Sequence, residues 1–187
     1  MTTTLTVPAL KEWSAAVHAL LDGRQTILLR KGGIHEKRFD VTAQRFLLFP
    51  TVAHSHAERV RPEHRDLLST AAADSTEAEV VLRAGAKVIA AIEVTRPVGL
   101  PDIEPLHIWT AGSVRADRLD FRPKHRLTVL VVQASPLARP VRLARTPDYS
   151  GCTSWVQVPV AGQWGEPVHD DEVLADIAER VRRAVNP

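Results

Sequence analysis

One stretch of the chain constrains the fold more than any other: every residue from Leu127 to Val132 is apolar or β-branched. β-branched side chains favour an extended backbone, and an unbroken run of this length is typical of a strand inside a sheet. A second run, Thr26 to Leu29, has the same character. The two segments predict central strands of one sheet.

Helical patterns stand near both ends of the chain. Pro8 would lie in the first turn of an N-terminal helix that Gly23 closes as a C-cap. Asp170 would cap a C-terminal helix that carries acids in its first turn and arginines in its last. A short helix is also expected over residues 62–72, beginning at a proline.

Further strands are expected where short apolar segments stand between turn residues. They comprise residues 39–41, 45–49 and 154–158, and a hairpin of 79–83 with 87–94 around Ala84-Gly85-Ala86. The alanines of this hairpin leave a helical alternative open. Helices and strands do not alternate as in a β-α-β protein. We therefore predict one domain over residues 1–187, of α+β class, with a mainly antiparallel, barrel-like sheet flanked by N- and C-terminal helices.

Composition excludes several classes of protein. The single cysteine, Cys152, leaves no intramolecular disulfide and no cysteine-rich zinc site. No apolar stretch reaches the roughly 18–20 residues of a membrane span, and the first residues lack a basic and apolar signal. We expect a cytoplasmic protein without a membrane partner.

The charges are segregated along the chain. Residues 24–65 hold nine basic and four acidic residues, and residues 111–146 hold eight and two. Together they could form one positive face that binds a polyanion. The alternative is that the charges scatter over the surface after folding.

A polar cluster follows the strand predicted to end near Leu29. Arg30 and Lys31 could hold a phosphate group, Gly32 and Gly33 would let backbone N–H groups approach it, and His35 stands beside them. The alternative is a solvated β-turn with glycines at its positive-φ positions.

Histidines are the candidates for acid–base chemistry, because imidazole titrates near neutral pH. His54 or His107 could act as a general base, with Glu12 or Glu36 as the orienting carboxylate. His54 and His56 have a spacing that zinc can use, but no third ligand is evident. We expect no metal and no cofactor.

A second polar cluster, His107-Ile108-Trp109-Thr110, also borders an apolar run. Trp109 is either a core residue or an aromatic platform for a nucleobase beside the basic residues that follow, Arg118 among them. Trp109, Thr110 and Arg118 are therefore candidate ligand-binding residues, and so is Lys11 in the N-terminal segment.

Five motifs in order resemble a bacterial family known as domain of unknown function 1802. They are Leu10-Lys11-Glu12-Trp13, the run from Leu28 to Ile34, Phe49-Pro50-Thr51 with His54, the cluster at 107–110, and Gly151-Cys152 with Ser154-Trp155-Val156. The resemblance spans residues 9–158, and Arg118 falls where the family usually has arginine. It implies a link to restriction-modification or defence systems, through the domains found beside family members.

The segment Gly23-Arg24-Gln25-Thr26, followed by Arg30, resembles the opening of ASCH domains in the PUA-like group. Those domains are small β-barrels that bind RNA or modified bases. The resemblance implies a PUA-like form of the predicted sheet.

Three functions follow from these patterns. The first is a nucleic-acid-associated binding protein whose Arg30, Lys31 and Arg118 contact the phosphates of RNA or DNA, while His35, His54 and His107 read or act on the bound group. The second is a histidine-dependent hydrolase or nuclease. The third is a structural or regulatory partner of a defence protein.

Overall fold

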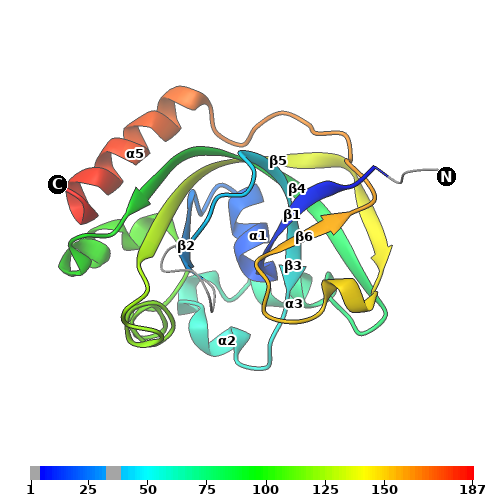
Figure 1. The fold of residues 1–187 in the computed structure, drawn as a ribbon, viewed down its shortest axis with the longest axis horizontal. Helices are drawn as coiled ribbons and strands as arrows, with labels where there is room; N and C mark the ends of the chain where they lie inside the picture. The colour runs from blue at the N-terminus through cyan, green and yellow to red at the C-terminus, as the bar shows by residue number, and fades with distance from the viewer. Residues whose placement is uncertain (1–4, 33–38) are drawn as a thin grey trace.

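A computed structural model describes residues 5–32 and 39–187 (Figure 1). Its six strands form one sheet in the order β2-β5-β4-β3-β1-β6. The strands are Val7–Trp13 (β1), Ile27–Lys31 (β2), Arg45–Thr51 (β3), Glu79–Glu93 (β4), Leu127–Ala144 (β5) and Trp155–Val158 (β6). The α-helices are Ser14–Leu21 (α1), His56–Arg59 (α2), Leu67–Ala72 (α3), Ala111–Val114 (α4) and Asp171–Val185 (α5). The 3₁₀ segments are Pro62–His64 (η1), Pro97–Leu106 (η2) and Pro147–Tyr149 (η4), and Arg115–Asp120 (η3) is π-helical.

The α+β class and the mainly antiparallel sheet are confirmed. Four of the five neighbouring strand pairs are antiparallel, and only β1 and β3 run parallel. Within the described residues the sheet is open, with β2 and β6 as its edges. It is nevertheless strongly curled, because Arg30 of β2 donates a hydrogen bond to the carbonyl of Lys11 in β1 (3.0 Å) although three strands separate β2 from β1 in the sheet order.

The N-terminal helix expected to begin near Pro8 is wrong in its first half. Residues 7–13 form β1, which pairs with both β3 and β6, and the helix begins only at Ser14. Apolar residues of both parts nevertheless pack into one core, since Leu10 and Leu20 lie in the same core cluster. The first part is extended because two neighbouring strands satisfy its backbone. Gly23 follows α1 with φ of 80°, as the C-cap prediction required.

The hairpin expected around residues 84–86 is also wrong. β4 is continuous, with irregular register between Leu82 and Ala84 and between Val88 and Ala90. Gly85 is required by close packing and not by a turn, because a Cβ at this position would come within 2.2 Å of the Trp164 ring. β5 extends twelve residues beyond Val132, the end of the apolar run, because it pairs with β4 along this length.

The buried hydrophobic residues form three core clusters around the sheet. α1 fills the hollow of the curled sheet, and α5 covers its outer side together with η2 (Figure 1). The capped C-terminal helix is confirmed, since the Asp170 carboxylate accepts the N–H of Val173 (2.9 Å). The helix expected over residues 62–72 is divided into η1 and α3.

None of the helices in residues 5–32 and 39–187 is both long enough and apolar enough to cross a membrane.

Candidate functional site

Chain segments that are distant in sequence meet at one corner of the sheet. Because β1 and β3 are parallel, their C-terminal ends lie at the same edge, which brings α2, shortly after β3, close to Trp13 at the end of β1. The residues after α2 then pair with the second polar cluster. Val60 bridges to Trp109, and Thr110 N–H donates to the carbonyl of Arg59 (2.8 Å). The sheet topology therefore assembles this corner.

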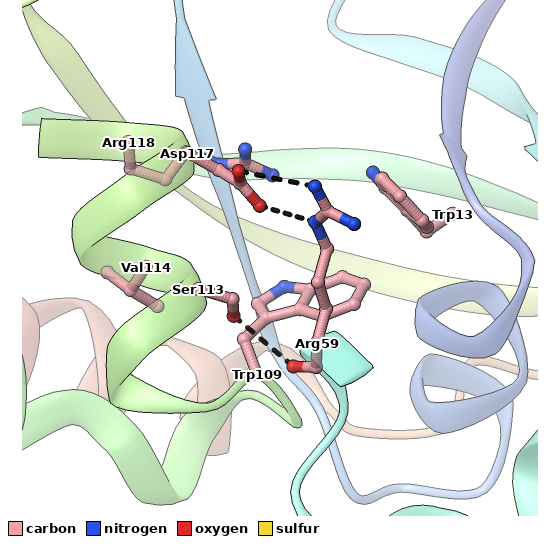
Figure 2. Close-up of a pocket in the computed structure, with 7 residues that line it drawn as sticks. All are labelled: Trp13, Arg59, Trp109, Ser113, Val114, Asp117 and Arg118. Atoms are coloured by element: carbon pink, nitrogen blue, oxygen red, sulfur yellow. Dashed lines mark hydrogen bonds and ion pairs between the residues drawn. The ribbon is translucent and has the colours of Figure 1, made fainter. Parts of the chain in front are cut away.

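A narrow pocket lies between Trp13 and the helical segment α4–η3 (Figure 2). Its lining residues are Trp13, Arg59, Trp109, Ser113, Val114, Asp117 and Arg118. The cavity measures about 10 Å³, which is room for about one water molecule. The pocket is therefore closed in the free protein.

Arg59 closes this pocket. Its guanidinium carbon lies 5.2 Å from the centre of the Trp13 ring, and its Nε is 2.6 Å from Oδ2 of Asp117. Figure 2 shows the guanidinium between the indole and the carboxylate. Both members of the ion pair are partly exposed, so the pair is weakly stabilising and can exchange partners.

Arg118 is a partly buried cation of the site. Burial is the main reason that its pKa is lowered. Its Nε donates to the Leu29 carbonyl (3.0 Å), and no other hydrogen bond of this guanidinium reaches a described residue. Its terminal nitrogens therefore keep donors for a ligand.

Glu12 organises the opposite wall. One carboxylate oxygen accepts the N–H of Trp13 (2.9 Å), and the other lies 3.3 Å from Nη1 of Arg30. Glu12 is 3% exposed, so it is a buried anion with two partners. This arrangement suits the positioning of Trp13 and Arg30.

Lys31 binds the end of the segment that carries Arg118. Its Nζ donates to the carbonyls of Phe121 and Arg122, the latter at 2.7 Å. Arg122 has φ of 50°, a conformation uncommon outside glycine, and the bond from Lys31 helps to hold it. Burial, followed by the charges of Arg118 and Arg122, lowers the pKa of Lys31.

The charges around Arg118 and Lys31 do not balance. Five cations and three anions of the described chain influence one another here. The cations are Arg30, Lys31, Arg59, Arg118 and Arg122, and the anions are Glu12, Asp117 and Asp120. The excess of positive charge favours an anionic ligand.

Aromatic rings complete the corner. The His56 ring lies 4.8 Å from that of Trp13 and 6.5 Å from that of Trp109, and the two tryptophans are 5.9 Å apart. His56 is 5% exposed, and its Nε2 has no partner among the described residues. Burial, with a smaller effect of Arg59, lowers the pKa of His56 to about 4, so the ring is neutral near pH 7.

Several residues singled out in the sequence do meet here. Glu12, Arg30, Lys31, Trp109 and Arg118 lie at this corner. Thr110 supports the corner indirectly, because its hydroxyl caps α4 by accepting the N–H of Ser113 (3.1 Å).

Other candidates lie elsewhere. His54 is exposed, and His107 lines a separate cavity on the far side of α4. Nζ of Lys11 donates to the Gly151 carbonyl (3.0 Å), so only the backbone of Lys11 takes part in the site. The Gly32 carbonyl lies 3.3 Å from Nδ1 of His125.

Gly33, His35 and Glu36 lie outside the described residues. Within the described chain, no three or more His, Cys, Asp or Glu side chains group as metal ligands would.

Sequence reasoning missed Trp13, Arg59 and Asp117 as site residues. Trp13 falls inside the segment expected to form the N-terminal helix, and Arg59 is one of many arginines in the basic block 24–65. The available signal was the position of Trp13 in the same motif as Glu12. Only the pairing of β1 with β3 brings Arg59 to the indole.

The fold and the site define an α+β protein with a cationic corner lined by aromatic rings. The chain matches the family described as Domain of unknown function (DUF1802) over residues 9–180, and it belongs to that family. The match extends beyond the segment over which the resemblance was recognised.

No curated protein matches the chain. Its structure is similar to the crystal structure of a mutant ZmASCH protein from Zymomonas mobilis, with 11% sequence identity and a TM-score of 0.45. The similarity covers 92% of this chain and 94% of that chain.

Proposed function

We propose that this protein binds single-stranded RNA or DNA at the corner formed by Trp13, Arg59 and Arg118. The observation that carries the proposal is the excess of positive charge next to a half-buried indole. Nucleic acid presents both matching groups, since its phosphates are anionic and its bases stack on aromatic side chains.

Arg118 and Arg59 are the proposed phosphate contacts. A guanidinium donates two parallel hydrogen bonds to a phosphate, and such bonds are strong where water is scarce. The desolvated guanidinium of Arg118 gains more from an anion than an exposed arginine would. Arg30 contributes to the positive potential while its Nη1 stays bound to Glu12 and the Lys11 carbonyl.

Binding requires the pocket to open. A cavity of about 10 Å³ cannot hold a nucleotide, so Arg59 must leave its place between Trp13 and Asp117. A phosphate would then replace the Asp117 carboxylate on Arg59, and the indole face would become available to a base. The local ion pair competes with the ligand.

The test is fluorescence anisotropy of labelled single-stranded RNA and DNA over a series of salt concentrations. Affinity should fall steeply as salt rises, because phosphate contacts release counterions. Arg59→Gln should weaken binding and flatten the salt dependence. The matched control is Arg142→Gln: Arg142 pairs with Glu79 at 2.6 Å, as Arg59 pairs with Asp117, but lies on β5. Absence of binding at low salt, or equal effects of the two variants, would contradict the proposal.

The histidine-dependent enzyme is less well supported by the geometry. His54 is exposed, and Nδ1 of His107 accepts the N–H of Trp109 (3.0 Å). Burial lowers the pKa of His107 to about 3, far from the neutral range in which a general base works well. Association with a restriction or defence protein stays a hypothesis that co-purification would test.

A further inference from the structure

A second, larger cavity lies on the opposite side of the α4–η3 segment from Trp13. It measures about 430 Å³, within the range of small-molecule sites, roughly 300–1,000 Å³. Its lining residues are Pro97, Val98, Leu100, Pro101, Glu104, His107, Ala111, Gly112, Val114, Arg115 and Leu119. The walls are mainly aliphatic residues of η2 and α4, with Leu119 of η3, and of these lining residues only Val114 also lines the Trp13 pocket.

His107 lines this cavity and carries a hydrogen-bond donor. The residue is 3% exposed, and its Nδ1 accepts the backbone N–H of Trp109. A ring nitrogen that accepts cannot carry the proton of a neutral imidazole, so the proton is on Nε2. The low pKa of His107 keeps the ring in this neutral form. Among the described residues Nε2 has no hydrogen-bond partner, which leaves its N–H for an occupant of the cavity.

Two charged residues complete the polar part of the lining. Glu104 supplies a carboxylate acceptor, and its nearest cation is Nε of Arg61 at 3.7 Å, longer than a hydrogen bond. Arg115 is exposed and stands at the edge of the cavity. One buried donor and one acceptor, set among aliphatic walls, define the chemistry of a suitable ligand.

We infer that this cavity binds a small neutral aromatic molecule that carries a hydrogen-bond acceptor and an N–H donor, such as an aromatic amide or a nitrogen heterocycle. The ring would lie against Val98, Leu100 and Leu119. Its acceptor would take the Nε2–H of His107, and its N–H group would donate to Glu104. This site is independent of the proposed nucleic-acid site, because it is lined by different polar residues.

The experiment is a titration of the whole protein with nicotinamide and with adenine, followed in two-dimensional amide NMR spectra. Indole is the control ligand, because it has a ring and an N–H group but no acceptor for His107. The shifts should centre on the backbone amides of the cavity, such as Val98, Gly112 and Leu119. Indole should bind at least tenfold more weakly than the better of the two probes.

Three variants test whether the ligand binds in the cavity and whether His107 contributes to its binding. A Cβ on Gly112 would meet nothing within 4 Å, so Gly112→Leu should fill the cavity without a clash and abolish binding. Ala116→Leu is its control, because it adds the same side chain at an exposed position of η3 outside the lining. His107→Asn keeps an acceptor for the Trp109 N–H but loses the Nε2 donor, and should weaken binding about tenfold.

Three outcomes would overturn the inference. These are the absence of shifts with both probes, binding that survives Gly112→Leu, and indole binding as tightly as nicotinamide or adenine. If His107→Asn fails to fold, the comparison of Gly112→Leu with Ala116→Leu decides alone. Loss of nucleic-acid binding in Arg59→Gln tests the other site and has no bearing on this one.

Discussion

The two sides of the segment from Thr110 to Asp120 carry two different kinds of candidate ligand site. On one side, Asp117 and Arg118 face a pocket with room for about one water, in which Arg59 is paired with Asp117. On the other, Arg115 and Leu119 line a cavity of about 430 Å³ with aliphatic walls. On the charged side an ion pair closes the pocket, and a ligand must displace one of its partners to bind. On the apolar side the cavity is open without any such rearrangement.

The backbone of this segment explains how neighbouring residues serve different sites. Residues 115–120 are π-helical, and Phe121 N–H donates to the carbonyl of Ala116, five residues earlier. π-Helical turns are rare and occur frequently at functional sites. The wide turn presents Asp117 and Arg118 to one side and Leu119 to the other. One element therefore serves two unlike environments.

The largest expected effect is on stability and reaches both sides. Ile108 is fully buried between His107 and Trp109 in the chain, so Ile108→Ala should lower the free energy of unfolding by about 2–5 kcal/mol. Urea denaturation measures this change in the free energy of unfolding. Val173→Ala is the control, because Val173 is 43% exposed on α5 and should change stability by less than about 0.5 kcal/mol. Equal effects of the two substitutions would mean that Ile108 is not part of a packed core.

Arg118→Met should weaken ligand binding on the charged side alone. Methionine retains an apolar stem but removes the guanidinium, and loss of a charged hydrogen-bonding group costs about 1.5–3 kcal/mol, or roughly 10–100-fold in affinity for single-stranded nucleic acid. Fluorescence anisotropy measures the change. Arg115→Met, on the other side of the same segment, is the control and should have little effect. If both variants bind alike, the assignment of the two sides is wrong.

Lowering the pH should reduce folding stability on both sides of this segment, because each side contains a buried histidine. The pKa of His56 falls from 6.5 to about 4 and that of His107 to about 3, mainly because of burial. The unfolded chain therefore binds more protons below pH 6.5, so stability is complete above that pH and declines as pH falls towards 4. Each histidine should account for roughly 2 kcal/mol of this loss by pH 5.

Single substitutions show how much of the pH-dependent loss of stability comes from the histidine on each side. Chemical denaturation at pH 7.5 and at pH 5 would be compared for the parent protein, His56→Phe and His107→Asn. Each variant should lose about half of the extra destabilisation at pH 5. An unchanged pH dependence in one variant would show that its histidine is not held neutral in the folded protein.

The smallest effect tests whether the ion pair competes with the ligand. Asp117→Asn removes the carboxylate partner of Arg59, and a partly exposed pair is worth about 0.2–1 kcal/mol. Affinity for single-stranded RNA or DNA should rise about 1.4- to fivefold at low salt. Asp148→Asn, at a position remote from the site in η4, is the control. A fall in affinity would mean that Asp117 positions Arg59 rather than competing for it.

The two strongest local patterns were predicted well, and a third was misread. The β-branched run in β5 and the capped helix α5 were recognised because each is specified by neighbours in sequence. The segment around Leu10 was misread, because its apolar spacing fits a helix and a strand alike. Its extended form depends on pairing with β3 and β6.

The candidate site divides in the same way. The sequence by itself determined which residues carry charge and rings, and Glu12, Arg30, Trp109 and Arg118 were identified from these properties. Only the tertiary structure decided that Trp13 and Arg59 join them and that His107 belongs to another cavity. The physical reason is that contacts between β1, α2 and η3 join residues about 50 to 100 positions apart, and no local pattern encodes such distances.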